Sequence, residues 1–377
     1  MPSPLSYIEI SQDALLGNFE HCKKILPGKT KIAAVVKANA YGHGMAEVVK
    51  IMEPAADYFQ VDDINELEAL RAMSQKPTFV FGYVADHELD HAVELGGTIG
   101  IYDIERLEHL DRIGEKRKVT PEVHIKIDAL LGRQGILIDS LEAFLVRAKQ
   151  LRHAAIRGVY AHFANIEDTS DTSHAERQIE ILNRAYELCA KHGFKNLMRH
   201  ISSTAGIFTQ EQKLHSDIVR LGIGLYGLWP SEVLRNICEP KGIELTPALR
   251  WVTHVAQVKT VPKGFPIGYG LTHVTERVTK TAVIPQGYSD GYDRELSNKG
   301  SVLVRGQRAK VLGRVAMNMF VVDVTDIENV QREDEVVLLG AQGNEAITAE
   351  EIAEQAGTIN YEVIARMSPL LPRVVVP

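Results

Sequence analysis

The chain has 377 residues, of which 45% are hydrophobic and 24% charged, with a formal net charge of −7. This is the composition of a globular protein with room for two domains. A net acidic protein is a poor match for nucleic acid or an anionic membrane surface, so we expect neither as a partner.

The cysteines and the N-terminus point to a reducing compartment. Three cysteines stand far apart in no metal-binding or paired spacing, which predicts free thiols: Cys22, Cys189 and Cys238. The segment MPSPLSYIEI lacks the basic and apolar regions of a secretory signal, and no apolar run reaches the ~18 residues of a membrane span. We therefore expect a cytoplasmic protein.

From residue 31 to about 227, short β-rich segments alternate with longer segments of helical period. The strand candidates, in chain order, are IAAVVKA, DYFQV, TFVFGYV, TIGIYD, VHIKID, IRGVYAHF, MRHISS and IVRLGIGLYG. This βα rhythm predicts a (β/α)₈ TIM-type barrel, whose closure removes exposed sheet edges. An open doubly wound sheet is the alternative.

After about residue 228, strand candidates follow one another without helices between them. They are WVTHVAQVKTV, VTKTAVIPQGY, GSVLVRGQRAKVLGRVAM, MFVVDVTD and DEVVLLG, followed by one helix with a capping-box pattern at Thr348 and Glu351. The pattern predicts an α/β fold with a barrel domain over 1–240 and a mainly antiparallel β domain over 241–377. Residues 229–245, with two prolines, are the expected linker.

Lys37 ends the first barrel strand candidate, directly before a glycine-rich turn in KIAAVVKANAYGHG. A lysine at the carboxyl end of a barrel strand faces the mouth, where barrel enzymes place their active sites. Burial there disfavours the ammonium form and frees an amine able to form a Schiff base with a carbonyl. An isolated lysine would more often extend its head group to solvent.

The loops after the seventh and eighth strand candidates suggest a phosphate site. Barrel enzymes often bind phosphate there with backbone N–H groups, and this chain supplies SSTAG and RLGIG at those places. Pyridoxal phosphate, which carries both a carbonyl and a phosphate, would use Lys37 and these loops together.

These stretches resemble the alanine racemase family. AVVKANAYGHG resembles the cofactor-lysine motif of that family almost letter for letter. Further stretches match the family in order along nearly the whole chain: VHIKID with GRQGI, VYAHFA, VRLGIGLYG, PIGYG, GYSDGYDR, GRVAMNM and INYEVIARMSPLLPR. The resemblance implies a barrel plus a β domain, pyridoxal 5'-phosphate as cofactor, interconversion of L- and D-alanine for peptidoglycan, and a homodimer with shared active sites.

The resemblance also implies roles for individual residues. Lys37 becomes the Schiff-base lysine and the base for the D-isomer, and Tyr269 of the partner subunit the base for the L-isomer. Further cofactor-binding residues are implied at Tyr41, Arg133, His162, Thr204, Arg220, Gly222, Ile223 and Tyr361, and substrate-binding residues at Arg133 and Met317. Lys126 resembles a lysine that is carbamylated in many members. His200, Tyr288, Arg294 and Arg314 resemble the supporting network and the substrate corridor.

Arg220 carries a chemical consequence of its own. An arginine is protonated at all relevant pH values, so it can donate a hydrogen bond to the cofactor ring nitrogen but cannot protonate it. We expect a weaker electron sink and fewer side reactions such as transamination.

Three departures from the family pattern concern neighbouring residues. The family often has Asp-Thr-Gly-Met where this chain has Asp128, Ala129, Leu130 and Leu131, and often Met-Asp where it has Met317 and Asn318. The asparagine and serine expected after His200 are Ser203 and Thr204. None of the three involves Lys37 or Tyr269.

Other functions stay open at this point. A serine or broad-specificity racemase would share the motifs. HELDH, residues 87–91, matches the H-E-x-x-H pattern of zinc metallopeptidases, but no third ligand is evident and no metal is expected. Related decarboxylases would place a carboxylate on the ring nitrogen where this chain has Arg220, and small cofactor-carrying barrels would lack residues 241–377.

Overall fold

The structure is a computed structural model that describes residues 4–209 and 216–377. The chain divides into two compact units, one of residues 15–38 and 48–246, the other of residues 1–14, 39–47 and 247–377. The boundary expected near residue 240 stays a prediction, because these units are not continuous in sequence. Within the described part of the chain, no helix is long and apolar enough to cross a bilayer.

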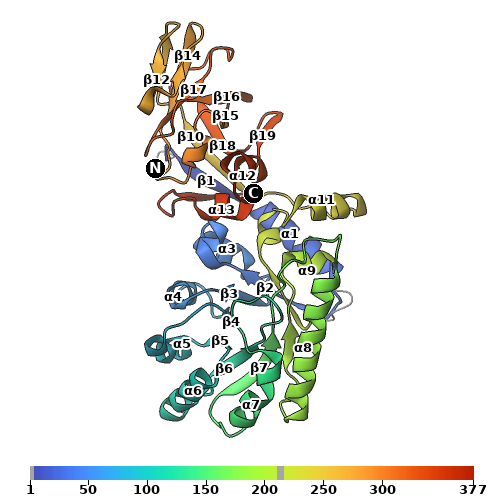
Figure 1. Cartoon of the computed structure of the whole chain (residues 1–377). Helices are drawn as coiled ribbons and strands as arrows, with labels where there is room; N and C mark the ends of the chain where they lie inside the picture. Colours follow the sequence, from blue (N-terminus) through green and yellow to red (C-terminus); the bar gives the residue numbers. More distant parts are fainter. Residues whose placement is uncertain (1–3, 210–215) are drawn as a thin grey trace. The chain divides into compact units, whose positions relative to one another are not determined.

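The first unit is the expected barrel (Figure 1). Its parallel strands pair in the order β8-β7-β6-β5-β4-β3-β2-β9. Their bounds are β2 (Lys31–Val35), β3 (Tyr58–Val61), β4 (Thr78–Val80), β5 (Gly97–Ile101), β6 (Glu122–Lys126), β7 (Ala155–Tyr160), β8 (Met198–His200) and β9 (Ile218–Leu221). Each lies within, or one residue from, its sequence-predicted segment, so the barrel prediction is confirmed.

Backbone hydrogen bonds between the first and last segments of this series nearly close the ring. Asp217 N donates to Arg199 O, and Arg220 N donates to Ser202 O, each at 3.0 Å. Strands β4 and β5 are buried at every residue, as expected when both faces of a parallel sheet are covered.

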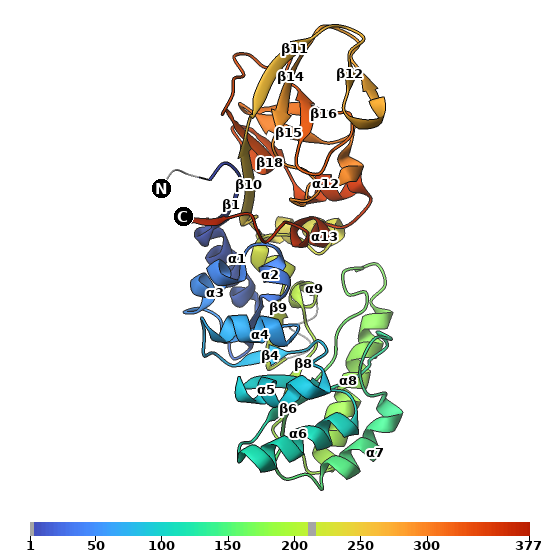
Figure 2. The ribbon, with the colours of Figure 1, turned by 90° about the vertical axis from the view of Figure 1, so that its left-hand side faces the viewer.

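Helices follow the strands and lie outside them (Figure 2). They are α3 (Met45–Met52), α4 (Ile64–Arg71), α5 (Leu89–Glu94), α6 (Ile104–Arg117), α7 (Ile138–Ala148), α8 (Ser173–Lys191) and α9 (Thr204–Thr209). Helix α1 (Gln12–Ile25) precedes the barrel. Helices α4 and α6 begin where Asp63 and Asp103 accept a hydrogen bond from the N–H three residues on, the usual role of an N-cap aspartate.

The second unit contains a mainly antiparallel sheet in the order β11-β14-β17-β16-β15-β18-β10-β1-β20, with β19 paired to β18 and a separate β12-β13 pair. The bounds are β1 (Tyr7–Ser11), β10 (Leu249–His254), β11 (Gln257–Val261), β12 (Pro266–Ile267), β13 (His273–Val274), β14 (Thr279–Ile284), β15 (Ser301–Val304), β16 (Gln307–Leu312), β17 (Phe320–Asp323), β18 (Glu335–Gln342), β19 (Glu345–Ile347) and β20 (Arg373–Val376). The β domain prediction is confirmed, and β1 from the N-terminus adds to it.

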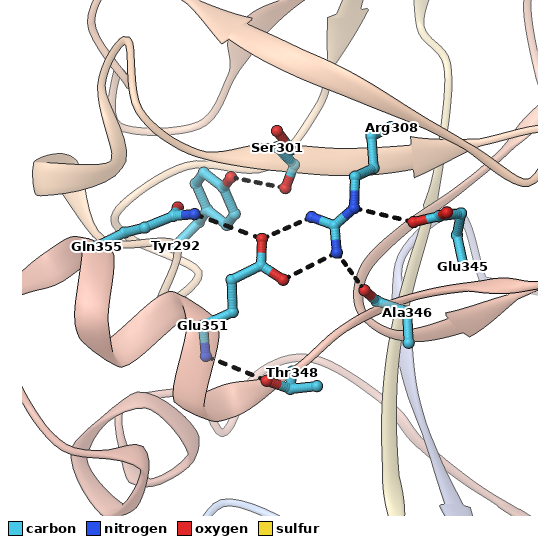
Figure 3. A network of polar contacts seen from close by, with 8 residues as sticks. All are labelled: Tyr292, Ser301, Arg308, Glu345, Ala346, Thr348, Glu351 and Gln355. Carbon is cyan, nitrogen blue, oxygen red and sulfur yellow. Dashed lines mark hydrogen bonds and ion pairs between the residues drawn. The ribbon is translucent and has the colours of Figure 1, made fainter.

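Helices α12 (Ala349–Ala356) and α13 (Asn360–Ala365) complete this unit. Thr348 Oγ1 accepts from Glu351 N at 3.1 Å, as the capping-box pattern predicts. The Glu351 carboxylate binds Arg308 on β16 instead of the cap backbone, and Arg308 also reaches Glu345 at 2.9 Å (Figure 3). This network ties α12 and β19 to the sheet.

The expected linker is more ordered than its prolines suggested. It contains α11 (Glu232–Cys238), which begins where Ser231 Oγ accepts from Leu234 N at 3.2 Å.

Candidate active site

Lys37 follows β2 and stands at the carboxyl end of the barrel strands, as predicted. The backbone then turns in the left-handed region, with φ of 52° at Ala38, Asn39 and Tyr41 and 53° at Ala40. Left-handed turns of non-glycine residues cost about 1–2 kcal/mol per residue, and such strain is concentrated at functional sites. The turn ends at Gly42, where an added Cβ would lie 1.9 Å from Ile364 O.

Arg220 on β9 is buried at the barrel mouth and donates to two histidine rings. Its Nη1 lies 2.6 Å from His200 Nδ1, and its Nη2 lies 3.1 Å from His162 Nδ1. Nη2 also donates to the carbonyl oxygens of Ala161 and Ile201. The sequence-predicted residues Arg220, His162 and His200 are therefore brought together.

The direction of these hydrogen bonds determines the ring tautomers. Arginine only donates, so His200 Nδ1 accepts and His200 Nε2 carries the hydrogen. His200 Nε2 then donates to His124 Nδ1 at 2.8 Å, which leaves the hydrogen of His124 on Nε2. The chain of donors runs from Arg220 through His200 to His124, and it requires both rings to be neutral.

Burial and the nearby guanidinium keep these rings neutral. Burial, followed by the charge of Arg220, lowers the pKa of His124 and of His162 to about 3. The same two causes lower the pKa of His200 well below its usual range. The rings thus stay hydrogen-bond acceptors for Arg220 at neutral pH.

Lys126 on β6 is 4% exposed. Its Nζ donates to Gln134 Oε1 at 3.2 Å and lies 5.8 Å from the centre of the Tyr160 ring. Burial, then Arg133 and Arg220, lowers the pKa of Lys126 to about 8. The positive charge of Arg133 thus disfavours the ammonium form of Lys126.

The loop after β6 retains a compact form despite its departure from the family pattern. Asp128 Oδ1 accepts from the N–H groups of Leu131 and Gly132, each at 3.0 Å. Leu130 occupies the left-handed region with φ of 63°, a conformation that glycine adopts more easily. The loop carries Arg133, which is exposed.

The loops after β8 and β9 meet at Thr204. Thr204 Oγ1 accepts from Gly222 N at 3.2 Å and from Gly224 N at 3.1 Å. A Cβ on Gly224 would lie 2.6 Å from Thr204 Cγ2, so the close approach requires glycine. The predicted residues Thr204, Gly222 and Ile223 therefore lie side by side, at the place where barrel enzymes bind phosphate.

The remaining predicted residues belong to the second unit. Tyr41 and Tyr361 lie there with ring centres 6.3 Å apart. A hollow of about 930 Å³ in the β domain is lined by five of the others: Tyr269, Tyr288, Arg294, Arg314 and Met317. Tyr269 is 74% exposed and stands between Gly268 and Gly270, which adopt φ of 72° and 71°.

Asn318, one of the departures, also lines this hollow. Its Nδ2 donates to Ser289 Oγ at 2.8 Å, so the amide is oriented by the domain itself.

The sequence interpretation missed Asp62, Glu66 and His124. Lys37 Nζ donates to Asp62 Oδ1 at 3.1 Å, and Glu66 accepts from two backbone N–H groups beside this pair. His124 precedes Lys126 by two residues, so strand alternation places both on one face, a signal that was available. Asp62 directly follows its strand candidate and could have been found by position.

The HELDH motif gains no support. His87 lies in a 3₁₀ turn (Asp86–Glu88) and His91 in α5, where His91 lies 3.6 Å from Glu94. Over residues 4–209 and 216–377, no three His, Cys, Asp or Glu side chains form a group that could hold a metal ion.

Comparisons with known proteins agree over nearly the whole chain. The alanine racemase N-terminal domain family matches residues 10–230, and the alanine racemase C-terminal domain family matches residues 248–375. Alanine racemase 1 of Caldanaerobacter subterraneus subsp. tengcongensis is 37% identical over 370 residues, covering 97% of this chain and 94% of the relative. The alanine racemase of Halothermothrix orenii is 39% identical over 372 residues, covering 98% of this chain and 96% of the relative.

Solved structures give the same result. The alanine racemase of Bacillus anthracis with bound L-Ala-P has a TM-score of 0.92 at 32% identity and covers 100% of this chain and 96% of its own. The alanine racemase of Clostridium difficile has a TM-score of 0.93 at 29% identity, and the match covers 100% of this chain and 97% of the other. A barrel with a lysine at its mouth, joined to a β domain, thus defines an isomerase of the racemase class. The chain belongs to the alanine racemase family.

Proposed function

We propose that this protein interconverts L- and D-alanine with pyridoxal 5'-phosphate bound covalently to Lys37. The observation that carries the proposal is the arrangement at the barrel mouth. Lys37 lies two residues beyond β2, and a buried Arg220, held by neutral histidines, lies on the neighbouring strand β9. The names of the relatives support alanine as substrate.

The residues of the barrel fit this cofactor. An amine suits its carbonyl, and the two loops that meet at Thr204, Gly222 and Gly224 lie where barrel enzymes bind phosphate, which suits the phosphate of this cofactor. The family resemblance also implies phosphate binding by Tyr41 and Tyr361 and a contact of Arg133 with the phenolic oxygen. When bound, pyridoxal phosphate withdraws electrons from the substrate Cα and so acidifies its hydrogen.

Racemisation requires proton transfer on both faces of a planar carbon. In our proposal Lys37 holds or removes the proton on the face of the D-isomer. Tyr269 of a second copy does so on the opposite face, for the L-isomer. Arg220 donates a hydrogen bond toward the ring nitrogen without giving up its proton, because guanidinium groups do not deprotonate in proteins.

Lys126 is the proposed site of carbamylation. A lysine with a pKa of about 8 has a substantial neutral fraction near neutral pH, and the neutral amine is the form that reacts with carbon dioxide. The product is an anion beside Arg133, so repulsion would become a charge-assisted hydrogen bond. Labelling with ¹³C-bicarbonate should give a carbamate resonance that is absent from Lys126→Met.

The β domain surface supports a homodimer. Tyr269, Met317 and Met319 line the hollow, and each is more than half exposed. Leu271, two residues after Tyr269, is 65% exposed. Exposed apolar patches of this kind mark interaction sites. In the proposed dimer this hollow faces the partner's barrel mouth, where Met317 and Arg133 bind the substrate. Arg314, Tyr288 and Arg294 line the corridor, with His200 supporting Arg220 from within.

The proposed setting is the cytoplasm, where D-alanine would supply peptidoglycan synthesis. The first test is the visible absorbance of the purified protein before and after borohydride reduction, with peptide mapping and incubation with L-alanine. A reducible chromophore on Lys37 and the appearance of D-alanine support the proposal. Serine in place of alanine tests for a broader racemase. A colourless protein that pyridoxal phosphate does not reconstitute would contradict the proposed function.

A further inference from the structure

The turn after Lys37 adopts a conformation that its own residues disfavour. Residues 38–41 all have φ of 52° or 53°, and none of them is glycine. Left-handed conformations are usually adopted by single residues, most often glycine, because the Cβ of any other residue comes too close to the following carbonyl oxygen. Such a run persists only where surrounding contacts impose it. The contacts that hold this turn therefore bear on Lys37, the residue directly before it.

Hydrogen bonds within the turn depend on Asn39. Its backbone O accepts from Gly44 N, and its Oδ1 accepts from Met45 N, each at 2.9 Å. These bonds close the turn on itself, but they do not attach it to the rest of its unit. Because the right-handed conformation is lower in energy, the turn also needs a partner from elsewhere in the chain.

Arg373, the first residue of β20, provides that partner. Its Nη2 donates to Gly42 O at 2.7 Å. Its Nη1 donates to two carbonyl oxygens of the segment between α13 and β20, Ser368 O at 2.7 Å and Leu371 O at 2.6 Å. Hydrogen bonds from a charged donor are stronger than those between neutral groups. One guanidinium thus joins the turn to the segment that follows α13.

The sheet fixes the backbone of Arg373. Strand β20 pairs in parallel with β1, with Arg373 opposite Ile8, and Ile8 N donates to Pro372 O at 2.9 Å. The aliphatic stem of the arginine lies against the turn, because a Cβ on Gly44 would lie 3.0 Å from Arg373 Cγ. The guanidinium therefore reaches Gly42 O from a strand whose own position is set by pairing.

We propose that Arg373 is a positioning residue for cofactor binding, because its hydrogen bond to Gly42 O holds the turn that follows Lys37 and carries Tyr41. It acts through the turn and does not have to touch the cofactor. A turn that has relaxed must be rebuilt when the cofactor binds, and this weakens binding. The inference rests on the proposed function, in which the cofactor attaches to Lys37 and Tyr41 binds its phosphate.

Hydrogen exchange tests the hold on the turn without any cofactor. In the cofactor-free protein the amides of Gly44 and Met45 are bonded to Asn39, so their exchange, followed by NMR, reports opening of the turn. Arg373→Lys keeps the charge and the stem but lacks the planar fork that serves separate carbonyl oxygens. We expect both amides to exchange about tenfold faster in this variant, the factor that one hydrogen bond from a charged donor contributes.

Cofactor affinity tests the consequence. Cofactor-free protein is titrated with pyridoxal phosphate, and binding is followed by absorbance and by borohydride trapping on Lys37. The dissociation constant should rise about tenfold in Arg373→Lys. In Arg373→Ala, where a space is left, guanidinium ions at concentrations well below those that unfold the protein should restore part of the affinity. Sodium chloride at the same ionic strength should not.

Arg250→Lys and Arg250→Ala are the matched controls. Arg250 on β10 is 25% exposed and also donates to a backbone carbonyl oxygen, Ala341 O at 3.0 Å, but that oxygen belongs to β18. The control variants should lower the stability of the protein to urea. They should keep the wild-type exchange of Gly44 and Met45 and the wild-type cofactor affinity, and guanidinium should not change either quantity.

Four results would overturn the proposal. Wild-type exchange and affinity in Arg373→Lys would mean that the turn does not depend on this hydrogen bond. Faster exchange with unchanged affinity would mean that the turn is held without benefit to the cofactor. Absence of rescue by guanidinium would assign the loss in Arg373→Ala to the stem. Equal losses of affinity in the Arg250 variants would mean that affinity only follows the stability of the domain.

Failure of the proposed function would look different. A wild-type protein that takes up no pyridoxal phosphate would refute the proposed function, and the role of Arg373 in cofactor binding with it. The exchange of Gly44 and Met45 would still report whether Arg373 holds the turn.

Discussion

Acid should destabilise this protein through histidines that the barrel keeps neutral. Burial and Arg220 hold the pKa of His124 and of His162 at about 3 in the folded protein, and lower that of His200 in the same direction. In the unfolded chain a histidine titrates near its ordinary pKa of about 6.5. The unfolded chain therefore binds more protons below pH 6.5, so stability present above that pH is lost on acidification.

The size of the effect follows from the distance between the working pH and 6.5. At pH 5, an unfolded histidine lies about 1.5 pH units below its pKa, which corresponds to about 2 kcal/mol per residue at about 1.4 kcal/mol per unit. His124 and His162 together should cost about 4 kcal/mol between pH 7 and pH 5. This is a large part of the ~5–15 kcal/mol by which most proteins are stable.

Urea unfolding of the cofactor-free protein at pH 7 and pH 5, followed by circular dichroism, measures this loss. In His124→Asn, the side-chain oxygen can replace Nδ1 as acceptor for His200, but the titrating ring is gone. The variant should lose about 2 kcal/mol less than the wild type between the two pH values. His87→Asn, at an exposed position, controls for the removal of a histidine. An equal loss in His124→Asn and wild type would refute the reasoning.

Two further predictions concern catalysis and the turn after Lys37. Tyr269→Phe should lower kcat/KM by ~10²–10⁴, and equally in both directions because the enantiomers have equal free energy. D-alanine should still exchange its α-hydrogen with solvent through Lys37, as NMR in deuterated water would report, and fast exchange of L-alanine would contradict the role of Tyr269. Gly42→Ala, with a left-handed φ and a Cβ 1.9 Å from Ile364 O, should lower the free energy of unfolding by about 2–4 kcal/mol. Gly357 also has a left-handed φ, but an added Cβ there would meet nothing within 4 Å, so Gly357→Ala should lower the free energy of unfolding by only about 1 kcal/mol. If thermal denaturation showed equal losses of stability in the two variants, the steric clash at Gly42 would be excluded as the cause.

The sequence by itself determined the two kinds of domain and the position of Lys37. Alternation of apolar segments with helical segments is a local property, and it predicted the barrel strands from β2 to β9. The motifs around Lys37 and Tyr269 are likewise short and continuous. Capping at Thr348 was predictable because its partner lies three residues away.

Contacts between distant segments were decided only by the tertiary structure. Strand β1 adds to the sheet of the β domain beside β10, more than two hundred residues later, because its hydrogen-bonding partners are set by the sheet and not by its own sequence. Glu351 binds Arg308 across strands instead of its own helix cap.

The same limit applies to the candidate site. The His124–His200–Arg220 chain joins three strands, and the Lys37–Asp62 pair joins two strand ends 25 residues apart. A single histidine or aspartate in a sequence carries no sign of which donor will face it. Hydrogen bonds and ion pairs act over about 3 Å, so the barrel must first bring the strand ends together before these side chains acquire their chemistry.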